Sequence, residues 1–495
     1  MSRKISVGLM LVVITLGTWL GWLTTRPPSP PSESDADYAA YRRMLAHLET
    51  MTAAPHPAGS EELEAVRSYI LSQIRDMGLE AAVETRIYTE EEIQADARER
   101  QQDRHVITKG KPHRRDPSNA EADARGTDSG RDQVELHNLL VKLDAPGTDR
   151  GVLMMSHYDS KPTTPGAADD MISVSAMLEA MRQQAGNKNL RNDLYFLFTD
   201  GEELGAMGAK AFVSAHPELR NSIDLIVNFE ARGNRGGLLM FETSANNYDL
   251  LRHYRSALSR PLAFSFTAAL YHRMPNGTDL TQFLDAGYAG LNFAAAEGVE
   301  HYHQPTDNFT NLNRGTAYDF LRTVLEMADY AARETLPGGG TGSGSDGVYF
   351  SLPFGQLILM SRTTACLLSG LAAAGGILWL VLQLRLGRIR LSHLASGTGW
   401  LLGTIIAAAL LSWGFVSLFG QAMPGDAVFL SQAFALGAGA LAVFFFRMRN
   451  RSPSEALAGI LPLQVLLLVG TTVYFLEISY LFSLSTLGIL AVALL

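Results

Sequence analysis

Apolar residues in the middle of the chain fall into short continuous runs, separated by segments whose apolar positions follow a helical period. Such runs predict strands covered on both faces of a sheet. Predicted strands span 81–88, 136–143, 151–156, 194–199 and 225–229, and predicted helices span 38–51, 61–77, 171–184 and 205–216. The alternation continues to Thr335 and predicts an α/β fold, with helices on both faces of a mixed, mostly parallel sheet.

Three segments depart from this pattern. Residues 93–133 are highly charged with almost no large apolar side chain, which predicts a disordered insert in the domain over 38–335. Residues 27–37 begin with a stiff Pro-rich spacer. Residues 336–362 include a Gly/Ser-rich stretch and are predicted to be a linker.

Both ends of the chain carry long apolar runs. Residues 5–23 follow Arg3 and Lys4 and predict a membrane anchor within 1–26. A cleaved signal peptide is the alternative, but the run is longer than a signal core and no small-x-small site follows it. The last third predicts a multi-span membrane domain of about five helices. Its predicted spans are 363–384, 396–419, 428–446, 455–475 and 479–495. The chain stops inside the last run, as a truncated version of a longer protein would.

The charges of the loops predict the orientation of these spans. The connections 385–393 and 447–451 are rich in arginine, whereas 421–426 and 477–479 contain no Lys or Arg. The positive-inside rule places the basic loops and the N-terminal Arg3-Lys4 in the cytoplasm, and the middle domain outside it. A periplasmic domain on a bacterial inner membrane is preferred, because a large lumenal domain would more often contain disulfides and this chain has one cysteine.

Composition narrows the chemistry further. The net charge of −9 argues against nucleic acid as a partner. The single cysteine, Cys366, excludes an intramolecular disulfide and a cysteine-based metal site. Any metal must therefore be held by histidine and carboxylate side chains.

Candidate ligands follow three successive predicted strands. His157 follows the first, Glu202 and Glu203 the second, and Glu230 the third. Active sites of open α/β sheets form at the carboxyl ends of strands, so these side chains are expected to meet. Singly, such residues are most often surface groups or, for Asp169-Asp170, a helix cap. Their coincidence at strand ends favours a site for two metal ions sharing one carboxylate.

The motifs resemble a known family. Their order is His-x-Asp at 157–159, Gly-Ala-x-Asp-Asp at 166–170, Gly-Glu-Glu at 201–203, then Glu230 and Tyr-His-x-Pro-x-Asp at 302–307. This order is similar to the co-catalytic di-zinc aminopeptidases of the zinc exopeptidase superfamily. The most similar branch is the membrane-bound endoplasmic reticulum metallopeptidases and their bacterial relatives, which share a Pro-His-Pro-x-Gly-Ser motif, here at 55–60.

The resemblance implies a metal-binding role for five side chains. His157, Asp169 and Glu230 would hold one zinc ion. Asp169, Glu203 and His303 would hold the second, with Asp169 bridging the two. Many soluble relatives have Asp at the position of Glu230, but the membrane branch accepts Glu.

The resemblance also implies the remaining catalytic roles. Glu202 would be the general base, and Asp159 would hydrogen-bond the far nitrogen of His157. Asp307 would support the loop of His303, and Tyr271 or Tyr302 would stabilise the oxyanion. The Asp169–Asp170 peptide bond would be cis. Together these roles predict a membrane-anchored zinc exopeptidase, an aminopeptidase that hydrolyses N-terminal peptide bonds of peptide substrates.

Two other functions stay open. Glutaminyl cyclases share this fold and a His-Tyr-Asp-Ser-Lys run, here at 157–161, but are expected to use one zinc ion. Receptor-like relatives keep the fold for binding alone, but they lose metal ligands that this chain retains.

Overall fold

The computed structural model describes residues 15–17, 19–107, 133–274, 277–336, 344–419 and 453–494. It divides into two compact units. The first contains residues 1–345 and 350–358, and the second contains 346–349 and 359–495.

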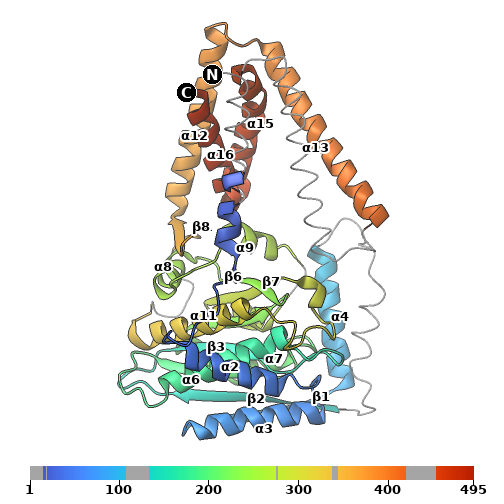
Figure 1. The fold of residues 1–495 in the computed structure, drawn as a ribbon, viewed down its shortest axis with the longest axis vertical. Helices are drawn as coiled ribbons and strands as arrows, with labels where there is room; N and C mark the ends of the chain where they lie inside the picture. The colour runs from blue at the N-terminus through green and yellow to red at the C-terminus, as the bar shows by residue number, and fades with distance from the viewer. Residues whose placement is uncertain are drawn as a thin grey trace. The chain divides into compact units, whose positions relative to one another are not determined.

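The first unit is built on a seven-stranded sheet with the order β1-β2-β4-β3-β5-β7-β6 (Figure 1). The strands are β1 (Ala82–Thr89), β2 (Gln133–Leu143), β3 (Gly151–His157), β4 (Asp193–Thr199), β5 (Ile223–Ala231), β6 (Arg235–Thr243) and β7 (Gly290–Glu297). Strands β4, β3, β5 and β7 are parallel, while β1, β2 and β6 run antiparallel to their neighbours. The predicted mixed, mostly parallel sheet is confirmed.

The continuous apolar strands are covered on both faces, as their pattern requires. Every residue of β3, β4 and β5 is buried. On one face, Phe212 of α7 (Met207–Ala215) and Phe283 of α10 (Asp279–Asp285) join Leu153 in a buried apolar cluster.

Other helices complete the unit. Helices α6 (Ile172–Gln184) and α11 (Arg314–Arg333) pack together and against the sheet, and α2 (Tyr38–Met51) packs on α6. The remaining helices are α3 (Glu61–Asp76), α8 (Tyr248–Ala257) and α9 (Ser265–Tyr271).

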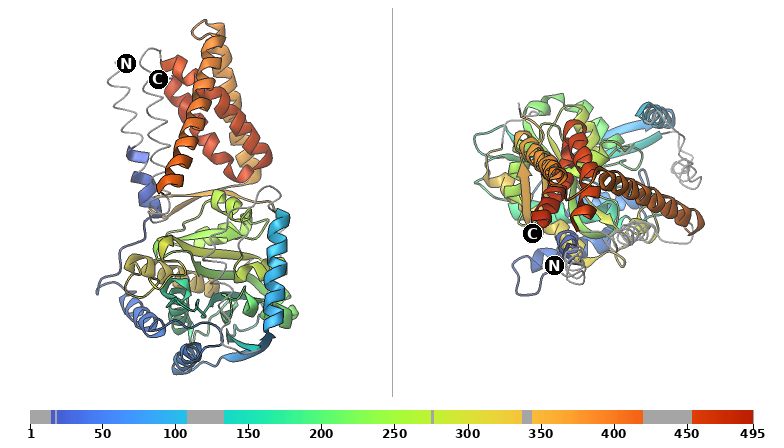
Figure 2. Two further views of the ribbon diagram at one scale, coloured as in Figure 1. Left: turned by 90° about the vertical axis from the view of Figure 1, so that its right-hand side faces the viewer. Right: turned by 90° about the horizontal axis from the view of Figure 1, so that it is seen from above.

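The charged insert differs in part from its prediction. Residues 90–107 form helix α4 (Glu90–Ile107), so the predicted disorder is wrong for 93–107, while 108–132 lie outside the described residues. Thr89 caps the helix, and its hydroxyl accepts the Glu92 N–H at 3.2 Å. Ile93 then packs into a small apolar cluster with Tyr88. Figure 2 shows α4 in light blue along the edge of the unit. Asp96 is also buried and lies 2.6 Å from the Lys210 ammonium. The cap, the buried Ile93 and this ion pair therefore anchor a helix that the composition did not predict.

The region predicted to be a linker, 336–362, contains a two-stranded sheet of β8 (Val348–Leu352) and β9 (Gln356–Met360). Four α-helices follow within the described residues: α12 (Arg362–Arg385), α13 (Leu391–Phe419), α15 (Pro453–Tyr474) and α16 (Ser479–Leu494). Among the described residues, α12 alone is long and apolar enough to cross a membrane, and 458–474 and 476–491 are shorter apolar helices. The span predicted at 428–446 and most of the anchor at 5–23 lie outside the described residues.

Candidate metal centre

The predicted ligands meet at the carboxyl edge of the parallel strands. His157 is the last residue of β3, Glu203 lies just beyond the end of β4, and Glu230 is the penultimate residue of β5. Asp169 lies in a short helical turn over Ala167–Met171, which leads into α6. His303 comes from the loop after β7 and has a left-handed backbone, with φ of 56°.

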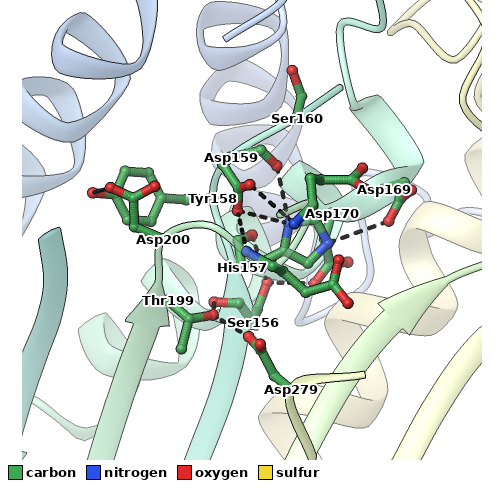
Figure 3. A network of polar contacts seen from close by, with 12 residues as sticks. Ser156, His157, Tyr158, Asp159, Ser160, Asp169, Asp170, Thr199, Asp200 and Asp279 are labelled. Atoms are coloured by element: carbon green, nitrogen blue, oxygen red, sulfur yellow. Dashed lines mark hydrogen bonds and ion pairs between the residues drawn. The ribbon is translucent and has the colours of Figure 1, made fainter. Parts of the chain in front are cut away.

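The first group of ligand atoms surrounds His157, whose ring is fully buried. Its Nε2 lies 3.3 Å from Asp169 Oδ1 and 3.8 Å from Glu230 Oε2. Nδ1 of His157 donates to the main-chain carbonyl of Asp159 at 2.9 Å. Because a carbonyl only accepts, Nδ1 carries a proton, and Nε2 is the ring nitrogen that faces the two carboxylates and is available as a metal ligand. Figure 3 shows His157 between Asp159 and Asp169.

The second group shares Asp169. Nε2 of His303 lies 3.3 Å from Asp169 Oδ2 and 3.4 Å from Glu203 Oε2. This nitrogen is buried and makes no hydrogen bond with the described residues. Each group of three offers ligand atoms that all lie within 4.8 Å of one another. The two carboxylate oxygens of Asp169 thus face different histidines.

These distances suit zinc. Two ligand atoms bound about 2.1 Å from a tetrahedral zinc ion lie about 3.4 Å apart. The nitrogen-to-oxygen distances of 3.3 to 3.8 Å match that spacing. Imidazole and carboxylate are also the donors that remain once cysteine is excluded. The residues therefore fit a pair of zinc ions with Asp169 common to both.

The charges of the cluster also favour a metal site. Burial raises the pKa of Glu230 well above its usual range, and the charge of Glu202 adds to the rise against the opposing effect of His157. Burial likewise raises the pKa of Glu202, which His157 opposes and Glu203 reinforces. Several buried carboxylates that repel one another are costly unless cations neutralise them. A site for divalent cations resolves that conflict.

The turn that carries Asp169 is held by hydrogen bonds from its main chain to Asp307. The Asp307 carboxylate accepts the N–H groups of Ala168 at 2.9 Å and Asp169 at 3.2 Å. Asp307 was expected to support the loop of His303, but its side chain fixes the Asp169 turn. The Asp169–Asp170 peptide bond is cis, as the resemblance implied.

The second acid of the doublet points away from the ligands. Asp170 accepts hydrogen bonds from Ser156 and Ser173, both at 2.5 Å. Burial raises its pKa well above the usual range, despite the opposing effect of His157. These contacts explain why Asp169, and not Asp170, faces the two histidines.

Asp159 supports two parts of the site at once. Its carboxylate oxygens accept the N–H of Glu202 at 3.1 Å and the N–H of Glu203 at 3.2 Å. Its Oδ1 also lies 3.4 Å from His157 Nδ1, but the closer partner of that nitrogen is the Asp159 carbonyl oxygen. The side chain expected to orient the imidazole therefore chiefly shapes the turn that carries Glu202 and Glu203.

Two supporting contacts were missed by sequence reasoning. Lys161 Nζ donates to the Glu203 carbonyl at 2.8 Å and lies 3.1 Å from Glu203 Oε2, so it fixes that carboxylate. His56, from the Pro-His-Pro motif, is buried, and its main-chain N–H donates to Ser160 Oγ at 2.9 Å. The motif thus braces the turn after His157. The run at 157–161 singled out Lys161, but nothing in the sequence indicated that Lys161 contacts Glu203.

The two aromatic candidates for stabilising the oxyanion have different neighbours. Tyr302 stacks on the His303 ring with centroids 3.7 Å apart, and the Arg232 guanidinium lies 4.4 Å from the Tyr302 ring centroid. The Tyr271 ring packs edge-on against Phe241.

The sequence over residues 138–328 matches peptidase family M28. The five candidate ligands and Glu202 all lie within that range. Residues 138–328 form a peptidase family M28 domain. It is a zinc metallopeptidase domain of the zinc exopeptidase superfamily, and the resemblance seen in the motifs is confirmed.

Curated relatives of the M28 domain include membrane proteases. A vacuolar membrane protease of Candida dubliniensis is 27% identical over 274 residues, covering 53% of this chain and 28% of that protein. A putative endoplasmic reticulum metallopeptidase 1 of Schizosaccharomyces pombe is 29% identical over 256 residues, covering 49% of this chain and 30% of that protein. The matches support the endoplasmic-reticulum-metallopeptidase-like branch. The alignments span less than a third of either relative.

Solved structures similar to the chain belong to two kinds of enzyme. An aminopeptidase from Aneurinibacillus sp. strain AM-1 matches with a TM-score of 0.45 and 17% identity, over 61% of this chain and 97% of that one. A glutaminyl cyclase of Porphyromonas gingivalis matches with a TM-score of 0.41 and 16% identity, over 60% of this chain and 99% of that one.

Proposed function

We propose that the chain is a membrane-anchored, zinc-dependent exopeptidase, an aminopeptidase that hydrolyses the N-terminal peptide bond of peptide substrates. The observation that carries the proposal is the pair of ligand groups that share Asp169; Glu202 precedes the ligand Glu203, and Asp159 accepts the N–H groups of both. Zinc, when bound there, acidifies a water molecule and polarises the scissile carbonyl.

The residues of the chain supply the proton transfer. Glu202 accepts the proton of the attacking water and passes it to the departing amine. Asp159 holds the main chain of Glu202 in place, and Lys161 holds Glu203. The free amine of a peptide would be attracted to the same acidic cluster, which favours an aminopeptidase.

A glutaminyl-cyclase-like acyl transfer is the second candidate, because the run at 157–161 fits both enzymes. The number of zinc ions separates them. The group of Asp169, Glu203 and His303 supports a second zinc ion, which the cyclase reaction is not expected to need.

We predict about two zinc ions per purified chain, with activity on aminoacyl amides lost to a chelator and restored by added zinc. Elemental analysis and a panel of aminoacyl amides check this outcome. One tight zinc ion in fully active enzyme would favour the cyclase. An active protein that retained full turnover after complete metal removal would contradict both proposals.

We further propose that the chain is a multi-pass membrane protein whose M28 domain lies outside the cytoplasm, in the periplasm of a bacterial inner membrane. The support is the apolar helix α12, the arginine-rich loop that follows it, and the membrane location in the names of the relatives.

Topology reporters test this arrangement. Alkaline phosphatase fused after Gly340 should be active, and a fluorescent protein fused after Asn450 should be bright. The reciprocal fusions should be silent, because each reporter works on one side of the membrane only. A cytoplasmic signal at Gly340 would contradict the arrangement.

A further inference from the structure

A second buried carboxylate, Glu242, lies near the ligand cluster, and none of the roles above uses it. Glu242 pairs with Asn292 across β6 and β7 and is 5% exposed. Its Oε2 accepts a hydrogen bond from Asn292 Nδ2 at 2.8 Å. Asn292 Oδ1 accepts from Asn228 at 2.9 Å, and the Asn228 amide lies 3.4 Å from Glu230 Oε1. Two amide side chains therefore connect Glu242 to Glu230.

Glu242 has a weak counter-charge. Asn292 is neutral, and its hydrogen bond goes to Oε2. Oε1 faces Nδ1 of the half-exposed His272 at 4.0 Å, at the limit of an ion pair. Burial raises the pKa of Glu242 to about 7, which the hydrogen bond from Asn292 only partly offsets. A glutamine would accept the same hydrogen bond without the cost of burying a charge. A purely structural role therefore does not account for a glutamate here.

A second unsatisfied group lies nearby. The Tyr271 hydroxyl is buried and makes no hydrogen bond with the described residues. Burial raises the pKa of Tyr271, and the charges of Glu242, Glu230 and Glu202 raise it further. The geometry places Tyr271 beside Glu242, because the next residue, His272, lies 4.0 Å from Glu242 Oε1, and the Tyr271 ring packs on Phe241, which precedes Glu242. A buried phenol normally finds a partner, and here the protein supplies none.

We propose that Glu242 and Tyr271 form an acidic subsite that binds the cationic side chain of a lysine or arginine at the N-terminus of the substrate. The inference rests on the proposed aminopeptidase function and names its substrate class. An ammonium or guanidinium group neutralises Glu242 and donates to the Tyr271 hydroxyl oxygen. Two amide side chains separate Glu242 from the candidate ligand Glu230, so a group bound by Glu242 lies apart from the zinc ligands.

The preference is tested with arginyl, lysyl, leucyl and methionyl amides on the zinc-loaded full chain. Arginyl and lysyl amides should have the highest kcat/KM. Glu242→Gln should lower kcat/KM for these two by about 10- to 100-fold, the worth of a hydrogen bond to a charged group, and change the leucyl value by less than about 2-fold. Tyr271→Phe should lower kcat/KM for the basic substrates by about 2- to 10-fold and leave the leucyl value unchanged, whereas a role in stabilising the oxyanion would lower kcat/KM for every substrate. Glu49→Gln, on the exposed face of α2, is the charge-matched control.

Two results would overturn the subsite. One is a wild-type preference for leucyl amide that Glu242→Gln leaves unchanged. The other is an equal loss on every substrate together with loss of zinc, since that pattern would show Glu242 acting through Glu230 and the two amides.

A binding experiment separates this inference from the peptidase proposal. Argininamide and leucinamide are titrated calorimetrically into zinc-loaded full-length Glu202→Gln protein, with and without Glu242→Gln. Tighter binding of argininamide that Glu242→Gln abolishes supports the subsite, even if the wild-type chain cleaves no amide. Equal binding of the two amides to the Glu202→Gln protein rejects it.

Discussion

Glu202→Gln is expected to keep both zinc ions and to lower kcat by a factor of at least about 10² to 10⁴, the usual contribution of general acid–base catalysis. Glutamine preserves the size of the side chain but cannot accept the proton of the attacking water. Glu203→Gln should behave differently, because Glu203 Oε2 lies 3.4 Å from His303 Nε2 in the second ligand group. We expect it to lose activity together with zinc and to regain part of both in excess zinc.

Kinetics on aminoacyl amides and metal analysis of the same preparations check the two variants against each other. Zinc loss from Glu202→Gln with full retention by Glu203→Gln would exchange the two roles. Unchanged turnover of every peptide substrate in both variants would remove the hydrolase proposal itself.

Much of the architecture could be predicted because it depends on local pattern. The sequences of β3, β4 and β5 are mostly apolar, and every residue of the three strands is buried. The polar residues that follow these strands could also be predicted to lie close together, because the carboxyl ends of parallel strands lie at the same edge of a sheet. The structure brings the five candidate ligands together there.

The supporting contacts could not be predicted, because they join residues far apart in sequence. Asp307 bonds the main chain of Ala168 across 139 positions, so its motif suggested the neighbouring loop instead. Glu242 belongs to no motif, and a glutamate on an edge strand suggests a solvent-exposed side chain. Only the pairing of β6 with β7 places it against Asn292, where burial changes its chemistry. Similarly, composition suggested disorder over α4, because one buried Ile93 carries little weight among so many charges.

Asp159→Asn should lower kcat/KM or zinc affinity by about 10- to 100-fold, the usual cost of removing a group that supports metal ligands. Both carboxylate oxygens of Asp159 accept main-chain N–H groups, from Glu202 and Glu203. Asparagine replaces one oxygen with an NH₂ group that confronts an N–H donor, so one of the two contacts must break. The main chain that carries the base and a zinc ligand then loses part of its support.

Zinc content measured beside kcat/KM distinguishes which contact matters. If zinc is retained and kcat falls, the substitution has displaced Glu202, the proton acceptor, and left the zinc ligands in position. Lost zinc would place it on Glu203 or on His157, whose Nδ1 lies 3.4 Å from Asp159 Oδ1. Asp144→Asn is the matched control, since Asp144 is exposed and its carboxylate lies 2.6 Å from the Lys142 ammonium. If Asp159→Asn matched that control in both zinc content and kcat/KM, Asp159 would have no part in holding the site.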